Sequence, residues 1–195
     1  MIFEPKWKSL MATTVQPIFT PQQCQNIIDM GHQQKTEEAK VGHNQGSLKG
    51  TVDTKKRITT LSWIPFTAMP QMYKIIEASM KQANRNHFGY DGMQLTEPAQ
   101  FTEYPKGGFY DWHMDADVNS ESEPPVRKIS MTILLSPQNE FEGGDLEFMT
   151  EGNRPPQLLQ GQAIFFCSLV RHRVSKVKKG VRRSLVQWFG GPPFR

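Results

Sequence analysis

Three residues of this chain have the types and the spacing that iron chemistry needs: His113, Asp115 and His172, here called the triad. Two imidazoles and one carboxylate can occupy one face of an octahedral Fe(II) ion and leave three adjacent positions open for a chelating co-substrate and dioxygen. We expect His113 and Asp115 to lie on a strand, because residues two apart on a strand project from the same face. On a helix they would diverge by about 200°. A His-x-Asp pair is common by chance, so the prediction depends on what accompanies it.

An arginine ten residues past His172 strengthens the prediction of an iron site. A guanidinium offers a planar, bidentate match to a carboxylate, so Arg182 could hold the far end of an organic diacid. On an alternating strand, Ser184 and Trp188 share the face of Arg182 and would line the same cavity if Arg182 points inward. The plainer alternative is a surface arginine on a strand, which the coincidence with the triad makes less favourable.

The first part of the chain, residues 1–95, is predicted to be a helical support. Thr20 can cap a helix that runs to about Gln34, and Gln23 completes a capping-box pattern with it. Apolar residues at helical spacing predict a second helix over roughly 67–87.

The remainder of the support region is expected to be extended or irregular. Residues 35–56 are polar and contain glycine, which predicts a long loop, and residues 57–63 are β-branched and aromatic, which predicts a strand.

Short strands with Pro and Gly punctuation dominate residues 96–195. We expect them at AQFTEY, GFYDWHMD, KISMTILLS, GDLEFMT, QAIFFCS, HRVSKV and RSLVQWF, with a tight hairpin turn at Gly143-Gly144. This spacing predicts a mainly β fold with flanking helices, a double-stranded β-helix or jelly roll, in a single domain of residues 1–195. In such a fold the strand of His113 and Asp115 could face the strand of His172 across the barrel mouth.

Composition limits the class of protein. The chain has 195 residues, 37% of them hydrophobic, and no apolar run near the roughly 20 residues that span a bilayer. The N-terminus lacks the pattern of a secretory signal. The two cysteines, Cys24 and Cys167, are far apart and suggest no disulfide framework. A cytoplasmic protein without a membrane partner is therefore expected, and the sequence predicts no particular oligomeric state.

The net charge of +4 is concentrated late in the chain, where residues 171–183 carry seven Lys or Arg and no acid. Such a patch could attract phosphate or a nucleic acid. The plainer interpretation is a solvent-exposed pair of strands with one or two arginines turned inward. We do not favour nucleic-acid binding, because no aromatic platform is interleaved with the charges.

At this point the sequence resembles a known family. The segment Tyr104–Asp115 resembles the Tyr-x-x-Gly-x-x-Tyr-x-x-His-x-Asp motif of prolyl 4-hydroxylase-like, 2-oxoglutarate-dependent iron oxygenases. Residues 133–146 resemble a strand-turn-strand of bacterial PKHD-type hydroxylases. The closing pattern of that family is matched by Gly161-Gln-Ala-Ile-Phe-Phe, His172-Arg-Val and Gly180-Val-Arg182. The resemblance covers about residues 100–190.

The resemblance implies roles for particular residues. The triad would bind Fe(II), Arg182 would pair with the distal carboxylate of 2-oxoglutarate, and Tyr104 would hydrogen-bond the same co-substrate. Leu134 stands where some prolyl hydroxylases have a tyrosine that helps to bind 2-oxoglutarate, so Tyr104 or Ser184 would have to supply that hydrogen bond. The co-substrates would be 2-oxoglutarate and O2, with ascorbate as a candidate reductant.

Tyr110, Arg127 and Trp188 fall where prolyl hydroxylases place groups near the substrate. The leading hypothesis is hydroxylation of a prolyl or similar residue in a peptide or protein, with decarboxylation of 2-oxoglutarate to succinate and CO2. The 35–56 loop could close over an extended chain. One alternative is the same chemistry on a small molecule such as a free amino acid. Another is a non-catalytic jelly roll, or a nucleic-acid-binding module that uses the basic segment 171–183.

Overall fold

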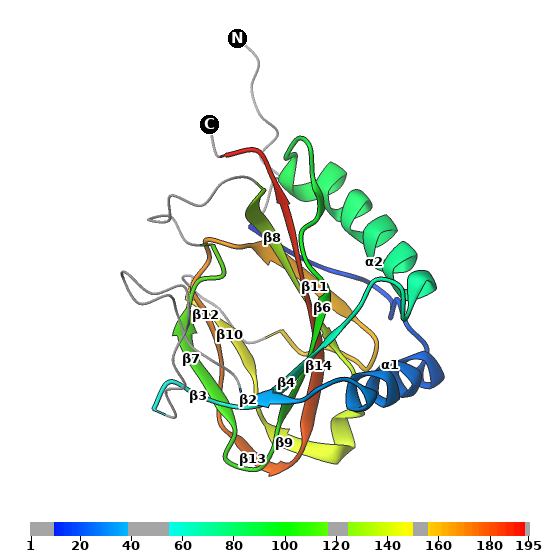
Figure 1. Cartoon of the computed structure of the whole chain (residues 1–195). Coiled ribbons are helices and arrows are strands. Elements are labelled where there is room, and N and C mark those ends of the chain that lie inside the picture. The colour runs from blue at the N-terminus through cyan, green and yellow to red at the C-terminus, as the bar shows by residue number, and fades with distance from the viewer. Residues whose placement is uncertain (1–9, 39–54, 117–124, 150–155, 194–195) are drawn as a thin grey trace.

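The computed structural model describes residues 10–38, 55–116, 125–149 and 156–193 (Figure 1). Two helices lie on one side of a large sheet, and the small sheet that contains β7, β10 and β12 lies on its other side. No helix among the described ranges is long and apolar enough to cross a membrane.

The first helix, α1 (Pro21–Gln33), begins at the predicted cap. The hydroxyl of Thr20 accepts from the backbone N–H of Gln23 at 3.2 Å, and Oε1 of Gln23 accepts from the backbone N–H of Thr20 at 2.8 Å. This reciprocal pair satisfies two N–H groups that a helix start leaves without partners. The capping-box prediction is confirmed.

The second helix, α2 (Pro70–Ala83), starts three residues later than expected. Proline fits the first turn of a helix because its missing N–H has no helical partner there. The helix continues as a π-helical turn, η1 (Asn84–Phe88), and stops at Gly89, which adopts a left-handed backbone with φ of 72°.

The large sheet has the order β1-β11-β8-β14-β6-β4-β2, and β5 pairs with β14. Its strands are β1 (Met11–Thr13), β2 (Glu37–Glu38), β4 (Thr60–Ile64), β5 (Gln94–Leu95), β6 (Ala99–Tyr104), β8 (Val126–Leu134), β11 (Ala163–Cys167) and β14 (Arg182–Gly191). All these pairings are antiparallel.

The small sheet has the order β10-β12-β7-β3, and β13 pairs with β9 beside it. The strands are β3 (Arg57–Ile58), β7 (Phe109–His113), β9 (Phe141–Gly143), β10 (Leu146–Phe148), β12 (His172–Val174) and β13 (Val177–Gly180), and a short 3-10 helix, η2 (Gln138–Glu140), precedes β9. Each of the seven predicted β segments of residues 96–195 contains a strand, and HRVSKV divides between β12 and β13.

Two of the predictions for the support region need correction. The expected strand at 57–63 is two strands in different sheets, since β3 pairs with β7 and β4 pairs with β6. The expected 35–56 loop begins with the short strand β2, which pairs with β4. The remainder of that loop, residues 39–54, lies outside the described residues.

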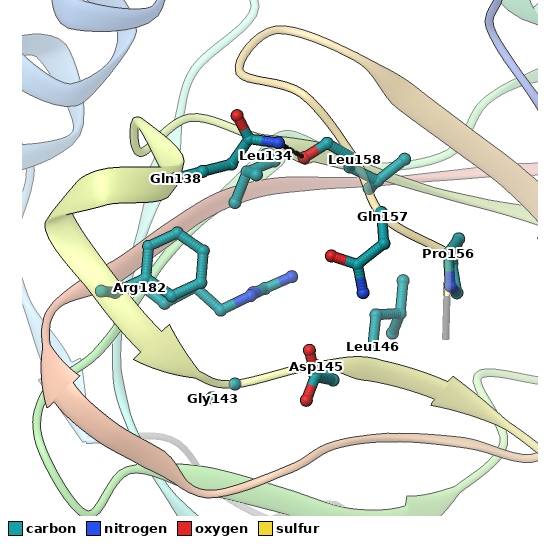
Figure 2. Close-up of a pocket in the computed structure, with 11 residues that line it drawn as sticks. Leu134, Gln138, Gly143, Asp145, Leu146, Pro156, Gln157, Leu158 and Arg182 are labelled. Atoms are coloured by element: carbon teal, nitrogen blue, oxygen red, sulfur yellow. Dashed lines mark hydrogen bonds between the residues drawn. The ribbon is translucent and has the colours of Figure 1, made fainter. Parts of the chain in front are cut away.

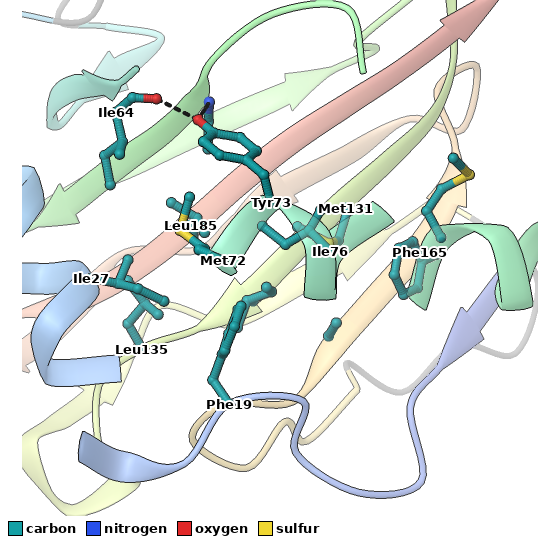
Figure 3. Packing of buried hydrophobic residues seen from close by; sticks show 14 of the residues in the cluster. Phe19, Ile27, Ile64, Met72, Tyr73, Ile76, Met131, Leu135, Phe165 and Leu185 are labelled. Atoms are coloured by element: carbon teal, nitrogen blue, oxygen red, sulfur yellow. Dashed lines mark hydrogen bonds between the residues drawn. The ribbon is translucent and has the colours of Figure 1, made fainter. Parts of the chain in front are cut away.

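Hydrophobic clusters cover both faces of the large sheet. One cluster packs the sheet against α1 and α2 and includes Ile76, Met131 and Phe165 (Figure 3). The other lies between the two sheets and includes Leu134 and Phe166. Neighbouring residues of β11 therefore point to opposite faces, as strand alternation requires. Because a slip of one residue would exchange the two faces, the burial fixes the register of the strands that carry the site.

Candidate metal and co-substrate site

The structure brings the three triad side chains together. His113, the last residue of β7, and His172, the first residue of β12, are register partners in an antiparallel pair. Asp115 follows β7 and turns its carboxylate toward both rings. Its Oδ1 lies 3.6 Å from Nε2 of His113, and its Oδ2 lies 3.6 Å from Nε2 of His172. One ligand atom from each residue lies within 4.8 Å of the others.

The way in which these residues meet differs from the sequence prediction. The strands of the two histidines do not face each other across the barrel mouth but are neighbours in the small sheet. Asp115 is not on the strand, because β12 begins at His172 and offers no further partner to β7. The backbone N–H groups of Asp115 and Ala116 instead donate to the carbonyl of Ser168, each at 3.0 Å.

Both histidine rings are oriented by the backbone. Nδ1 of His113 lies 2.8 Å from the carbonyl oxygen of Asp111, and Nδ1 of His172 lies 3.0 Å from that of Val170. A carbonyl can only accept, so in each ring Nδ1 carries the proton and Nε2 presents a lone pair. Second partners of this kind are what fix the tautomer and orientation of metal-binding histidines.

The protonation states also suit a cation. Burial, together with the neighbouring His172, lowers the pKa of His113 to about 4, so its ring is neutral at neutral pH. Burial alone would raise the pKa of Asp115, but His172, His113 and a hydrogen bond from Ser130 outweigh it and hold that pKa below its usual value. A neutral imidazole at His113 and an ionised carboxylate at Asp115 are the forms in which these groups bind metals.

Arg182 points inward, as the sequence predicted. It is 3% exposed and begins β14, where its register partner is Tyr104 of β6. Its Nη1 donates to Oγ of Ser184 at 3.1 Å, and its guanidinium carbon lies 5.6 Å from the centre of the Tyr104 ring. Strand alternation thus places the three predicted co-substrate residues in one group.

The guanidinium of Arg182 projects into a cavity of about 170 Å³ (Figure 2). Its walls are apolar at Leu134 and Leu146 and polar at Asp145 and Gln157. Neither of these polar residues was predicted to line the site, although Asp145 directly follows Gly143-Gly144. Burial lowers the pKa of Arg182, while Tyr104 and Asp145 act in the opposite direction.

The glycine pair Gly143-Gly144 beside this cavity leaves space for Arg182. Gly143 and Gly144 have φ of 73° and 68°. The predicted hairpin turn is wrong, because β9 and β10 do not pair with each other but run in the same direction along β13 and β12. A Cβ at Gly144 would lie only 2.8 Å from Cδ of Arg182 and 2.9 Å from Cγ2 of Val177. The absence of a side chain at Gly144 therefore leaves room for Arg182.

Two pairs of an arginine and an aromatic ring flank the triad. The ring of Tyr110 stacks on His113 with centroids 3.5 Å apart, and the guanidinium carbon of Arg57 lies 4.3 Å from the Tyr110 centroid. The guanidinium carbon of Arg127 lies 4.0 Å from the ring of Trp188. The three predicted substrate residues, Tyr110, Arg127 and Trp188, are thus next to the triad or one residue away from it.

Glu97 holds Arg127 in place, a contact that the sequence did not reveal. Nε and Nη2 of Arg127 donate to the two carboxylate oxygens of Glu97 at 2.7 and 2.6 Å. Nη1 of Arg127 donates to the backbone carbonyl of Asp115 at 3.4 Å. The pair therefore connects the start of β6 to the loop that carries the triad carboxylate.

Comparison with known proteins agrees with this arrangement. Residues 99–190 match the model of the 2OG-Fe(II) oxygenase superfamily, where 2OG is 2-oxoglutarate. The matched residues include all three members of the triad. A PKHD-type hydroxylase of Shewanella oneidensis is 33% identical over 93 residues, which are 47% of this chain and 42% of that protein. One of Parvibaculum lavamentivorans is 36% identical over 95 residues, with the same two shares. The match thus spans less than half the length of these relatives.

Solved oxygenases share the fold. The viral collagen prolyl hydroxylase of Paramecium Bursaria Chlorella virus-1, in its 2OG complex, superposes with a TM-score of 0.70 at 19% identity over 94% of this chain and 97% of its own. A prolyl-4-hydroxylase of Pseudomonas putida gives 0.69 at 18% identity over 94% of each chain. The fold is the double-stranded β-helix of these 2OG oxygenases, supported by helices, as predicted.

The basic segment, residues 171–183, is partly neutralised within the chain. Arg182 is buried beside the cavity, and three of the other six cations meet acids on neighbouring strands. The ion pairs are Arg173 with Glu147 at 2.7 Å, Lys179 with Glu142 at 3.1 Å and Arg183 with Glu103 at 2.8 Å. Four of the seven cations in residues 171–183 are therefore buried or paired with an acid, which favours the plainer interpretation of this segment as a pair of strands with arginines turned inward.

Proposed function

We propose that this protein is an Fe(II)- and 2-oxoglutarate-dependent dioxygenase whose metal ligands are His113, Asp115 and His172. The observation that carries the proposal is the orientation of the two rings. Each Nδ1 is held by a carbonyl, so each Nε2 lone pair faces a carboxylate oxygen 3.6 Å away. A facial set of two histidines and one carboxylate is the donor set of non-haem Fe(II) oxygenases, so the residues fit the ion.

Arg182 would bind the distal carboxylate of 2-oxoglutarate. Its buried guanidinium projects into the cavity, and Ser184 holds one of its nitrogens. Tyr104 lies beside it and would donate a hydrogen bond to the same carboxylate, while Leu134 and Leu146 would exclude water from the co-substrate methylenes. Iron in this site would couple reduction of O2 to decarboxylation of 2-oxoglutarate, giving succinate, CO2 and a hydroxylated substrate. Ascorbate would serve as reductant.

The substrate we infer is a prolyl or similar residue in a peptide or protein. The support is the set of Tyr110, Arg127 and Trp188 beside the triad and the fold shared with prolyl hydroxylases. Burial raises the pKa of Tyr110 to about 12, so its hydroxyl keeps its proton and can donate to a substrate carbonyl. Trp188, with Arg127 over its ring, would form a flat wall for a pyrrolidine. The same chemistry on a free amino acid is the alternative.

Anaerobic loading followed by oxygen tests the chemistry. The protein is incubated with Fe(II) and 2-oxoglutarate, oxygen is admitted, and succinate is measured, because slow turnover without a substrate is expected. His113→Ala with His172→Ala should abolish metal binding. Arg182→Ala should weaken 2-oxoglutarate binding and leave metal affinity largely intact. Wild-type protein that binds no Fe(II), or a double variant that binds it unchanged, would sink the proposal.

A peptide array tests the substrate. Proline-rich peptides are incubated with the loaded protein and oxygen, and a mass gain of one oxygen identifies a hydroxylated sequence. Free amino acids are assayed in parallel. Hydroxylation of a free amino acid with none of any peptide would replace the leading hypothesis by the small-molecule alternative.

A further inference from the structure

Arg57 is a buried cation without an anionic partner among the described residues. It is 8% exposed, and its Nε makes no hydrogen bond. No ion pair joins it to an acid in the described ranges; its contact is with the Tyr110 ring, 4.3 Å from its guanidinium carbon. A cation–π contact offsets only part of the cost of removing a guanidinium from water. Within the described ranges, the positive charge of Arg57 is therefore not paired with any acid.

This charge lies beside the triad for a structural reason. Arg57 is the register partner of Tyr110 where β3 pairs with β7. The Tyr110 ring in turn stacks on His113, at 3.5 Å between centroids and 15° between planes. Arg57 is thus separated from a proposed iron ligand by a single aromatic ring.

The charge of the second arginine beside the triad, Arg127, is compensated by an acid. Arg127 also lies over an aromatic ring, but Glu97 receives two of its N–H groups at 2.6 and 2.7 Å. Its charge is therefore neutralised within the chain. Arg57 has the same kind of aromatic contact but no acidic partner among the described residues. Only the Arg57 side of the site therefore leaves a positive charge for a ligand to neutralise.

A second donor at the site also lacks a partner. Nε1 of Trp188 is buried and has no hydrogen-bond partner among the residues that the structure describes, and Trp188 as a whole is 6% exposed. An unmade hydrogen bond of a buried donor is costly, and such groups mark places where a ligand completes the network. Each of the two arginine–aromatic pairs beside the triad thus carries one donor, Nε of Arg57 or Nε1 of Trp188, that has no partner among the described residues.

We propose that Arg57 binds a carboxylate of the substrate, so that the substrate is an acid rather than a neutral prolyl segment. This inference rests on the proposed function and deepens it. A guanidinium matches a carboxylate in a planar, bidentate geometry and leaves a neutral analogue with an unpaired charge opposite it. Rejection of an analogue that leaves buried polar groups unpaired is strong. The carboxylate is either the α-carboxylate of a free amino acid or an acidic side chain next to the hydroxylated residue of a peptide.

Matched probes distinguish these sources. The full chain is loaded with Fe(II) and 2-oxoglutarate under nitrogen, and probe binding is measured by calorimetry. One pair is L-proline and L-prolinamide. The other is the N-acetylated, C-amidated tetrapeptide Gly-Pro-Asp-Gly and its Gly-Pro-Asn-Gly analogue. Arg57→Gln removes the charge and keeps much of the stem, Arg57→Lys keeps the charge without the fork, and Lys56→Gln removes an exposed neighbouring charge as the control.

In one pair the carboxylate member should bind wild-type protein at least about ten-fold more tightly than the amide, the effect of one charge-assisted hydrogen bond. Arg57→Gln should remove this preference, Arg57→Lys should retain part of it, and Lys56→Gln should retain all of it. A preference in the proline pair identifies a free amino acid, and one in the tetrapeptide pair identifies a peptide.

No carboxylate preference in either pair overturns the proposal, as does a preference that survives Arg57→Gln. If Arg57→Gln does not fold, an unchanged preference in Arg57→Lys overturns it in the same way. Failure of the proposed function is recognised separately by the absence of Fe(II)-dependent succinate from wild-type protein. A protein that forms succinate and shows no carboxylate preference loses only the role of Arg57.

Discussion

Replacing Gly144 by alanine should damage 2-oxoglutarate binding through Arg182. The new Cβ would lie 2.8 Å from Cδ of Arg182, whereas carbon atoms in contact stay about 3.5–4.0 Å apart. The arginine stem must therefore shift by roughly 1 Å. Loss of one charge-assisted hydrogen bond costs about 1.5–3 kcal/mol. We expect 2-oxoglutarate affinity to fall by about 10- to 150-fold.

Gly107→Ala is the matched control for this substitution. Gly107 also has a left-handed backbone, with φ of 87°, but a Cβ there would meet nothing within 4 Å. Both alanines carry the same kind of backbone strain, about 1–2 kcal/mol. The two variants should therefore unfold at similar urea concentrations, and only Gly144→Ala should bind 2-oxoglutarate weakly in anaerobic calorimetry with Fe(II).

The 2-oxoglutarate affinities of Gly144→Ala and Gly107→Ala distinguish contact with Arg182 from backbone strain. Equal 2-oxoglutarate affinities in the two variants would show that Gly144 is needed only for its backbone conformation. The inference that Gly144 leaves space for Arg182 would then be refuted. A loss in both variants would point to backbone strain rather than to contact with Arg182.

Three further predictions concern other parts of the structure. The pKa of His113 is lowered to about 4 from 6.5 in the folded protein, so the unfolded chain binds this proton more readily. The free energy of unfolding of the metal-free protein should therefore fall by up to about 3 kcal/mol between pH 6.5 and pH 4 and keep its full value above that range. Urea denaturation should show this dependence on pH in wild type and not in His113→Ala. Thr20→Ala removes the cap of α1 and should cost about 1 kcal/mol in the same assay without changing Fe(II) affinity. Glu97→Gln breaks a partly exposed ion pair and should cost about 1 kcal/mol, while Mn(II) binding followed by paramagnetic resonance should weaken because Arg127 no longer holds the loop of Asp115; unchanged Mn(II) binding would contradict that role.

Local patterns made much of this fold predictable. The capping box at Thr20 involves residues three apart, so the helix start could be derived from neighbours in the sequence. Strand alternation likewise placed Ser184 on the face of Arg182, because both side chains belong to one strand. Both predictions depend on contacts between residues close in the sequence, and both are confirmed.

Contacts between distant segments were beyond this reasoning. Asp115 lies past the end of β7 because the neighbouring strand begins at His172, and nothing near Asp115 announces that limit. The ion pair of Glu97 with Arg127 joins residues 30 apart. That Arg57 has no acidic partner among the described residues depends on all the segments around it. Such features follow from strand order, which the spacing of polar residues does not encode.

The direct pairing of His113 with His172 has a mechanical consequence. A metal ion bound to both would be a cross-link between two adjacent strands that are far apart along the chain, and it would lie where the small sheet carries the site. Local opening of β7 from β12 would then require metal release, so amide hydrogen exchange in these strands should slow on loading, while the large sheet with its helical cover exchanges at its former rate. The rigidity of one sheet would thus report whether the centre is filled.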